Sequence, residues 1–199
     1  MSFHSFIQDG EGWSTLQDET QYANPYLAVH TVTVTSPTRP TPFKWTVCHR
    51  KAAVVVIAQT AEEKYLLVHQ ERVPIRATIW EFPAGQIDEA TDHDANAIRA
   101  TGLRELREES GYEPAPGGEV IPLGHFFPSC GFTDEHSHFL LVRPVIPTGH
   151  GQELDANEAI TEAKAFSLDE LKAMIASGEI RDANTLAAFA RLVAMGFAK

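Results

Sequence analysis

The chain holds one continuous apolar run, and this run constrains the fold more than any other segment. Residues 52–58 read AAVVVIA, without a polar position. A strand with one solvated face alternates apolar and polar residues, so an unbroken run of this length predicts a strand buried on both faces. Residues 64–73, KYLLVHQERV, follow across the turn-like segment QTAEEK. Together the two segments predict the beginning of a central mixed sheet.

The residues before this run predict a separate β-rich region. Residues 26–35 alternate apolar and polar positions and are rich in Val and Thr, SPTRPTP breaks the pattern, and residues 43–49 resume it. We therefore expect a small N-terminal β-rich lobe over residues 1–48 and a second unit over residues 49–199.

The second unit continues with a strand, a loop and a helix. The strand-like segment WEFPAG, residues 80–85, leads into the polar loop QIDEATDHD. Asp92 or Asp94 could cap a helix from about Ala95 to Ser110, which Gly111 would end. Two further strands are expected within residues 120–129 and 136–146. Apolar residues at helical spacing predict helices over residues 167–177 and 183–196.

Charge and composition exclude several classes of function. The net charge is −11, the pI is near 5.2 and Lys and Arg form no run, so nucleic-acid binding is not expected. No segment approaches the roughly 18 apolar residues of a membrane span, and the first twenty residues do not resemble a signal peptide. Cys48 and Cys130 are the only cysteines and are far apart, which predicts free thiols. We expect a cytoplasmic protein that does not act on membranes.

The predicted helix carries a cluster of acids. Glu105, Glu108 and Glu109 are at i, i+3 and i+4, so they project from one face within a single turn. One interpretation is a solvated face neutralised by Arg104 and Arg107. The other is a site for Mg²⁺ or Mn²⁺, because these cations prefer carboxylate and carbonyl oxygens. A backbone carbonyl from the PAG turn could contribute, and the sites of Thr101 and Gly102 could leave room beside the acids.

Gly85 and the stretch RELREESGY resemble the Nudix box, written G-x5-E-x7-R-E-U-x-E-E-x-G-U with U apolar. The matching positions are Gly85, Arg104, Glu105, Leu106, Glu108, Glu109, Gly111 and Tyr112. The loop after Gly85 is about five residues longer than in the box, and the first Glu is missing, since the two ways of counting reach Thr91 and Asn96. Glu89, Asp92 or Asp94 could replace it.

The resemblance implies a fold and a chemistry. The fold would be α+β, an α/β/α sandwich with a mixed central sheet. The reaction would be metal-dependent hydrolysis of the diphosphate bond in a nucleoside diphosphate linked to another group. Mg²⁺ (or Mn²⁺) would be held by Glu105, Glu108, Glu109 and the Ala84 carbonyl, and would neutralise the diphosphate and activate water.

Other residues resemble the ADP-ribose pyrophosphatase branch of this family. Pro128 lies at the branch's offset from the box, within FFPSCGFTDEHSHFLLV. In that branch an acid on this loop commonly activates water, so Glu135 is the best match and Asp134 the reserve, with Glu108 also counted as catalytic. A polar turn between strands is the alternative. The products would be AMP and ribose 5-phosphate.

The same branch suggests residues that bind substrate. The stretch HQERVPIRATIWEFPAG would place Gln70, Arg72 and Glu81 near the substrate, with Arg72 toward phosphate and Glu81 toward a ribose hydroxyl. N-terminal lobes of the branch often pair two subunits, so a homodimer is expected. Trp13 or Trp45 could stack on the base, although a Trp is more often part of the core.

Alternatives remain open at this point. The substrate could be a GDP- or UDP-hexose, because the box reads only the diphosphate and its metals. A catalytically silent sensor on the same fold is the alternative from another class. Cys130 could be a nucleophile with His125, His136 and His138 nearby, but spacing alone does not provide an activating base. His136 and His138 are more simply explained by a partly exposed strand face.

Overall fold

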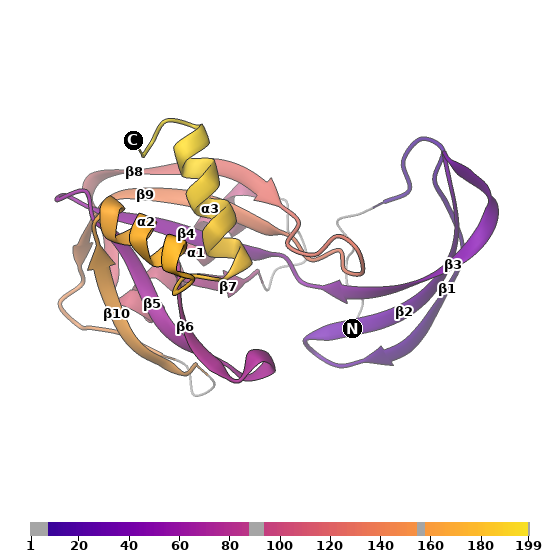
Figure 1. Ribbon diagram of the computed structural model, residues 1–199, viewed down its shortest axis with the longest axis horizontal. Helices are drawn as coiled ribbons and strands as arrows, with labels where there is room; N and C mark the ends of the chain where they lie inside the picture. Colours follow the sequence, from indigo (N-terminus) through magenta and orange to yellow (C-terminus); the bar gives the residue numbers. More distant parts are fainter. Residues whose placement is uncertain (1–7, 88–93, 155–157, 199) are drawn as a thin grey trace.

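The structure is a computed structural model that describes residues 8–87, 94–154 and 158–198. Its strands form two sheets (Figure 1). The N-terminal lobe is a three-stranded antiparallel sheet of β1 (Ser14–Ala23), β2 (Leu27–Ser36) and β3 (Arg39–Arg50). The lobe lies to one side of the larger unit, and β3 runs from it into the larger unit.

Two details of the lobe differ from the sequence prediction. The first strand, β1, was not predicted, because all ten of its residues are exposed and show no apolar face. The predicted break over SPTRPTP was too long, because β3 already begins at Arg39 and includes Pro40 and Pro42. The order β1-β2-β3 makes β3 an edge strand with β2 as its neighbour in this sheet, and Pro40 and Pro42 fall where the register with β2 is interrupted, so their missing N–H groups cost no ladder hydrogen bond.

The larger unit contains a seven-stranded mixed sheet in which β4 and β9 are parallel and the other described pairs are antiparallel. Its main path is β10-β5-β4-β9-β8, with β6 paired to β5 and β7 paired to β4. The strands are β4 (Ala53–Thr60), β5 (Tyr65–Arg72), β6 (Ala77–Glu81), β7 (Ala84–Gln86), β8 (Tyr112–Phe126), β9 (Ser137–Pro147) and β10 (Ile160–Phe166), and a 3-10 turn, η1 (Val73–Ile75), joins β5 to β6. The predicted central mixed sheet is confirmed.

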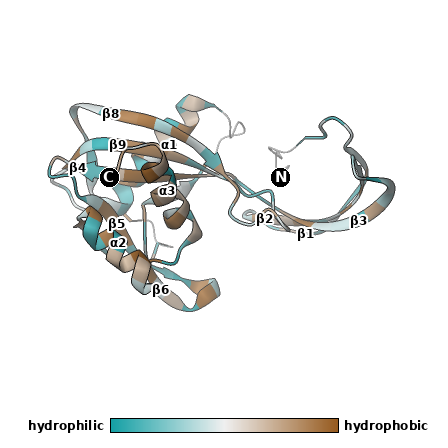
Figure 2. Ribbon diagram, turned by 45° about the horizontal axis from the view of Figure 1, so that its top comes forward, coloured by the Kyte–Doolittle hydropathy of each residue, from teal (hydrophilic) through white to brown (hydrophobic). Residues whose placement is uncertain are grey.

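Helices cover both faces of this sheet. Along β4, Val54 and Val56 pack in one buried cluster with Leu106 of α1 (Ala95–Ser110). The intervening residues Val55 and Ile57 pack in a second cluster, on the side of α2 (Leu168–Ser177) and α3 (Ala183–Ala194). Figure 2 shows β4 and β9 as a hydrophobic centre between the helices. The apolar run therefore predicted a doubly covered strand correctly, because both of its faces are buried.

The ends of α1 follow the predicted signals. Asp94 caps the helix, and its carboxylate accepts hydrogen bonds from the backbone N–H of Asn96 (2.6 Å) and of Ala97 (3.3 Å). Gly111 ends the helix with a φ of 72°, a left-handed conformation that glycine adopts without strain. The alternative cap, Asp92, lies outside the described residues, as does Glu89. Among the described helices, none is long and apolar enough to cross a membrane.

We expect Leu106→Ala to destabilise the protein by about 2–5 kcal/mol, because Leu106 is fully buried between α1 and the sheet and its removal leaves a cavity. Urea denaturation followed by circular dichroism measures the change. Arg99→Ala, at an exposed position of the same helix, is the control and should change the free energy of unfolding by less than about 0.5 kcal/mol. Equal effects of the two substitutions would contradict the packing described.

Candidate active site

The turn that contains Gly85 and helix α1 touch at an acidic side chain. A Cβ atom on Gly85 would lie 1.9 Å from Oε1 of Glu105 and 2.0 Å from its carboxyl carbon. No side chain fits in that space, so glycine lets the backbone of β7 approach the carboxylate directly. This contact explains why a glycine, and no residue with a side chain, occupies position 85.

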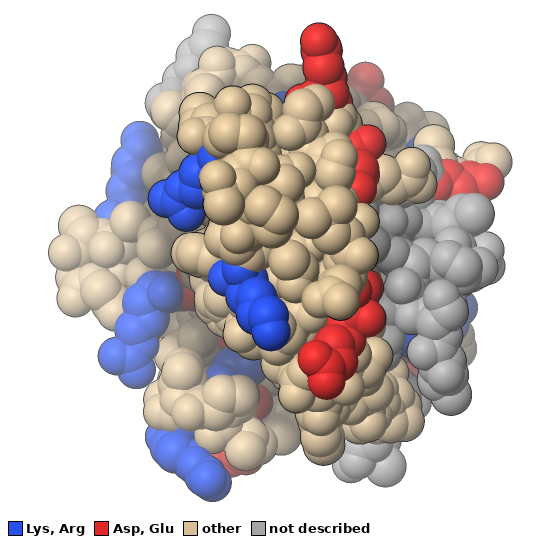
Figure 3. Space-filling model, turned by 90° about the vertical axis from the view of Figure 1, so that its right-hand side faces the viewer, with Lys and Arg blue, Asp and Glu red and all other residues tan. Residues whose placement is uncertain are grey.

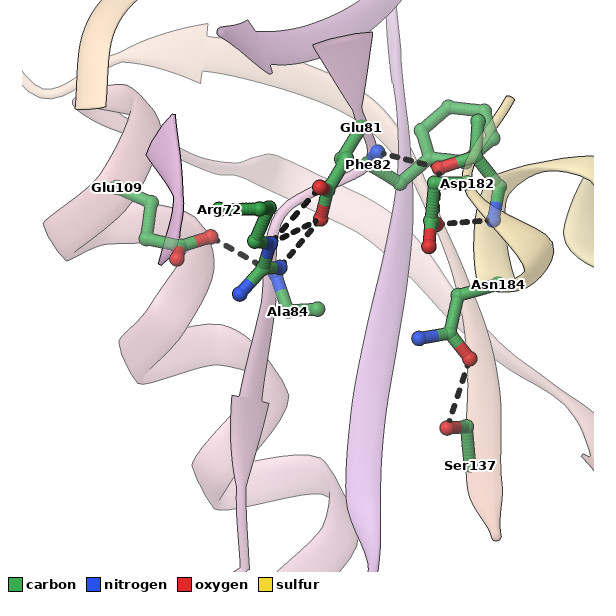
Figure 4. A network of polar contacts seen from close by, with 9 residues as sticks. Arg72, Glu81, Phe82, Ala84, Glu109, Ser137, Asp182 and Asn184 are labelled. Carbon is green, nitrogen blue, oxygen red and sulfur yellow. Dashed lines mark hydrogen bonds and ion pairs between the residues drawn. The ribbon is translucent and has the colours of Figure 1, made fainter. Parts of the chain in front are cut away.

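One helical turn later, Glu109 is fixed on the same turn of backbone. Its carboxylate accepts a hydrogen bond of 2.8 Å from the backbone N–H of Ala84 (Figure 4). Glu109 is 2% exposed and Glu105 is 4% exposed. The interpretation of this helix face as simply solvated is therefore wrong, because two of its three acids are buried. Ala84, predicted as a carbonyl ligand, thus also holds an acid through its N–H.

A third carboxylate, that of the half-buried Glu158, lies beside these two acids. Glu105, Glu109 and Glu158 each offer an oxygen atom, and the three atoms lie within 4.8 Å of one another. Sequence reasoning missed Glu158, which precedes β10 and is far from the box along the chain. Only the pairing of β10 with β5 brings it back beside α1. The one available signal was the position of this acid, two residues before the segment that forms β10.

Glu108 is less buried than its neighbours and interacts with arginine. Arg104 bridges two of the acids, with one nitrogen 2.5 Å from Oε1 of Glu105 and another 2.6 Å from Oε2 of Glu108. Gly102, expected to leave room beside the acids, instead faces the sheet, where its Cβ would lie 2.7 Å from Cδ1 of Leu140. That expectation was wrong because Gly102 lies on the packed side of the helix.

The acids of this cluster have altered proton affinities. Burial raises the pKa of Glu105 to about 7, with Glu158 and Glu108 adding to the effect and Arg104 opposing it. Burial raises the pKa of Glu109 to about 8, where the Ala84 N–H opposes the shift and Glu105 and Glu158 add to it. Carboxylates that are this close and this buried favour either bound protons or a cation. An all-oxygen group of this kind fits Mg²⁺ or Mn²⁺.

Arg72 and Glu81 form a pair close to these acids. Nε of Arg72 lies 2.8 Å from Oε1 and 3.1 Å from Oε2 of Glu81, and Nη2 donates to Oε2 as well (Figure 4). Burial raises the pKa of Glu81, and Arg72 opposes that shift. Burial raises the pKa of Glu109 and of Glu135, and the charge of Arg72 opposes the rise at both, so Arg72 acts electrostatically on both acids. Gln70, from the same strand, is half-buried.

The loop between β8 and β9 carries the predicted base. Glu135 lies 3.1 Å from Nη1 of Arg50, and burial raises its pKa, with Arg50 opposing. Asp134, the predicted reserve, accepts instead from Nδ1 of His49 at 2.6 Å. Pro128 is half-buried at the start of this loop. The loop therefore holds Glu135 and Asp134 in two different interactions with the N-terminal lobe.

A cavity of about 510 Å³ lies between this loop and the lobe. Four aromatic side chains line it: Trp13, Trp45, Phe127 and Phe132. Trp13 is 51% exposed and Trp45 is 49% exposed, so neither is a core residue, and the alternative of plain core tryptophans is wrong. Cys130 also lines the cavity, and it and Cys48 are free thiols as predicted.

One histidine prediction was also wrong. His136 was expected on a partly exposed strand face, but it is 1% exposed and lies just before β9. Its ring packs among those of His125, Phe127 and His138, with centroids 5.3 to 6.0 Å from its own. A pattern of alternating residues could not reveal this, because two of these three neighbours, His125 and Phe127, come from β8 and the loop that follows it.

A family model described as the NUDIX domain matches residues 49–189 of the chain. The chain belongs to the Nudix hydrolase family. An ADP-ribose pyrophosphatase of Bacillus subtilis (strain 168) is 34% identical to this Nudix chain over 133 residues, 67% of each protein. A methanol dehydrogenase activator of Bacillus methanolicus is 35% identical over 136 residues, 68% of this chain and 69% of the relative.

A solved structure has the same fold as this chain. One described as an ADP compounds hydrolase superposes with a TM-score of 0.74 over 96% of this chain and 99% of its own, at 15% sequence identity. The predicted Nudix fold, with a mixed sheet between helices and an added N-terminal sheet, is confirmed. At this identity the likeness supports the fold alone.

We expect Gly85→Ala to weaken Mg²⁺ binding at least about tenfold, because the new Cβ would displace the Glu105 carboxylate. Isothermal titration calorimetry measures the affinity, and the thermal midpoint reports whether the Nudix domain remains folded. Gly10→Ala is the control, since a Cβ at Gly10 meets no described atom within 4 Å. Unchanged Mg²⁺ affinity in a folded Gly85→Ala protein would exclude Glu105 from the metal site.

Mg²⁺ binding should also depend on pH. The pKa values of about 7 and 8 exceed those of unfolded Glu, so the folded metal-free protein binds extra protons. Its stability from these groups is complete below about pH 4 and is lost as pH rises through 7 and 8. Mg²⁺ must displace these protons, so its affinity should rise with pH up to about 8, approaching tenfold per unit for each proton released.

Calorimetry at a series of pH values, in buffers of different ionisation enthalpy, measures both the affinity and the protons released. Glu109→Gln should remove the upper part of the rise, whereas Glu162→Gln, at an exposed position of β10, should leave the profile unchanged. A pH-independent affinity between 6 and 8 in the wild type would mean that protons do not occupy the carboxylate cluster.

Proposed function

We propose that this chain is a metal-dependent pyrophosphohydrolase whose preferred substrate is ADP-ribose, cleaved to AMP and ribose 5-phosphate. The observation that carries the proposal is the carboxylate group formed by the buried Glu105 and Glu109 and the half-buried Glu158, beside the Gly85 turn. Nudix membership supports the reaction class. The Bacillus subtilis relative, named an ADP-ribose pyrophosphatase, supports the substrate.

The acidic group would hold the cations. Glu105, Glu108, Glu109 and the Ala84 carbonyl would bind Mg²⁺ or Mn²⁺, and Glu158 joins them on the basis of its position. When bound, the cations neutralise the diphosphate and lower the pKa of water at the site. The protein has a net charge of −11, so a polyanionic substrate would otherwise meet a repulsive field at the point of contact.

Glu135 would accept the proton of the attacking water. Burial raises its pKa, which makes it a better proton acceptor near neutral pH, and Arg50 orients it. Glu108 would assist this proton transfer from α1, where its carboxylate forms an ion pair with Arg104. Glu158 is the competing candidate for the base, because it lies within the carboxylate group itself.

The pair of Arg72 and Glu81 would position the substrate. Glu81 occupies the edge of the guanidinium that carries Nε and Nη2. The Nη1 side of Arg72 can therefore donate to a phosphate oxygen, because a guanidinium has five N–H groups. Glu81, fixed by this contact, would accept from a ribose hydroxyl, with Pro128 contributing from the loop between β8 and β9.

The cavity beside the lobe would receive the base. Its volume of about 510 Å³ is within the range of small-molecule sites, and Trp13 or Trp45 would stack on the adenine.

The N-terminal lobe would also pair two copies of the chain. Several large apolar side chains of the lobe are exposed, among them Leu16, Tyr22 and Tyr26. Figure 3 shows this end of the molecule with a mainly uncharged strip between basic and acidic side chains, a surface suited to a homodimer contact.

Turnover of a panel tests the substrate and the reaction class together. The panel contains ADP-ribose, GDP-mannose, UDP-glucose and NADH, each with Mg²⁺, with Mn²⁺ and with chelator, and the released nucleoside monophosphate (AMP, GMP or UMP) is quantified. We expect metal-dependent cleavage with the highest kcat/KM for ADP-ribose. A higher value for a GDP- or UDP-hexose would correct the substrate. Retained binding without turnover of any compound would instead favour the sensor alternative.

Variants of three acids separate metal binding from proton transfer. Glu109→Gln should lower turnover and weaken Mg²⁺ affinity, because it removes a ligand charge. Glu135→Gln should lower kcat about 10²–10⁴-fold with Mg²⁺ affinity retained. Glu158→Gln should weaken Mg²⁺ affinity, and if it instead lowers kcat alone while Glu135→Gln is fully active, Glu158 is the base. Glu162→Gln is the matched control, with wild-type turnover expected.

A further inference from the structure

Three side chains of the N-terminal lobe form a second possible cation site. Asp18 of β1, His30 of β2 and His49 of β3 each offer a ligand atom, and these atoms lie within 4.8 Å of one another. His30 is opposite Thr20 on one neighbouring strand and Val47 on the other. Asp18 and His49 are two residues from those positions, so all three side chains project from the same face of the sheet.

The second nitrogen of each imidazole already has a partner. Nδ1 of His49 lies 2.6 Å from Oδ2 of Asp134, and Nε2 of His30 lies 3.3 Å from Oγ1 of Thr20. These contacts leave Nε2 of His49 and Nδ1 of His30 as the nitrogens for a cation. Metal-ligating histidines usually donate their other N–H to a carboxylate or another oxygen in this way, which fixes the tautomer and the ring orientation.

The contact between Asp18 and His30 is the one that a cation would replace. Oδ1 of Asp18 lies 2.5 Å from Nδ1 of His30, within hydrogen-bond distance. Tetrahedral coordination at about 2.0–2.1 Å would need them roughly 3.3 Å apart. Asp18 can provide this change, because its side chain is 49% exposed, whereas the side chains of His30 and His49 are 19% and 16% exposed.

We propose that Asp18, His30 and His49 bind a transition-metal cation, with Zn²⁺ as the reference ion, at a site separate from the acidic group on α1. Two imidazoles and one carboxylate suit Zn²⁺, whereas Mg²⁺ prefers oxygen ligands and retains water. The inference does not depend on the proposed hydrolase function, since it uses none of the residues of the acidic group.

The position of the site gives it a structural consequence. Asp18 and His49 line the aromatic cavity, and Asp134, which holds His49, directly precedes Glu135. A cation at this point would join all three strands of the lobe and, through His49, the loop between β8 and β9. Three protein ligands also leave a coordination position for water or a small ligand, as in open zinc sites.

Equilibrium dialysis against Zn²⁺ in a large excess of Mg²⁺, followed by metal analysis, tests the site without measuring activity. Mg²⁺ occupies the oxygen ligands, so retained Zn²⁺ reports the histidine site. We expect one Zn²⁺ per chain in the wild type and in Glu109→Gln. His30→Ala and His49→Ala should lower Zn²⁺ affinity at least about 100-fold, and X-ray absorption of the wild type should show two imidazole ligands.

Two further variants keep the test decisive. Thr20→Val removes only the oxygen beside Nε2 of His30 and should weaken Zn²⁺ about 10–100-fold, even where an alanine variant fails to fold. His150→Ala, an exposed histidine in a distant loop, is the control and should bind Zn²⁺ as the wild type does. Wild-type affinity in folded His30→Ala and Thr20→Val, or loss of Zn²⁺ in Glu109→Gln, would overturn the proposal.

Discussion

The close contact between helix α1 and the Gly85 turn is the constraint on which the site depends. Leu106 anchors the helix in the core, and the same packing brings Glu105 and Glu109 against the backbone of β7. Burying carboxylates is unfavourable unless they are paired or hydrogen-bonded. Here the N–H of Ala84 and the guanidinium of Arg104 offset part of that cost, and a bound cation would offset more. Helix packing and metal affinity therefore arise from one contact.

A second dependence links the N-terminal lobe to the loop between β8 and β9. The N–H of Cys48 donates to the Phe132 carbonyl at 2.7 Å, and Nε1–H of Trp45 donates to the Gly131 carbonyl at 3.2 Å. Next along β3, His49 holds Asp134 and Arg50 holds Glu135. The placement of the proposed base is thus set by a strand from the other sheet. The same contacts enclose the aromatic cavity.

Local signals in the sequence predicted most elements because their causes are local. The cap of Asp94, the stop at Gly111 and the apolar run of β4 each depend on neighbouring residues or on side-chain period. The prediction failed where a distant partner decides the outcome. Strand β1 has no buried face of its own and is held by pairing with β2. His136 is packed against the rings of His125, in β8, and of Phe127, in the loop that follows β8. The alternation of residues within β9 does not include either of them.

The sequence by itself determined the Nudix box, the acidic face of α1 and the alternation of strands that forms the sheet, since spacing along a helix or strand fixes which side chains share a face. Only the tertiary structure decided that Glu158 joins Glu105 and Glu109, that Arg72 pairs with Glu81, and that Asp18, His30 and His49 converge. These groups come from elements separated along the chain. Strand pairing and helix packing set the distances between them, and no local periodicity encodes such distances.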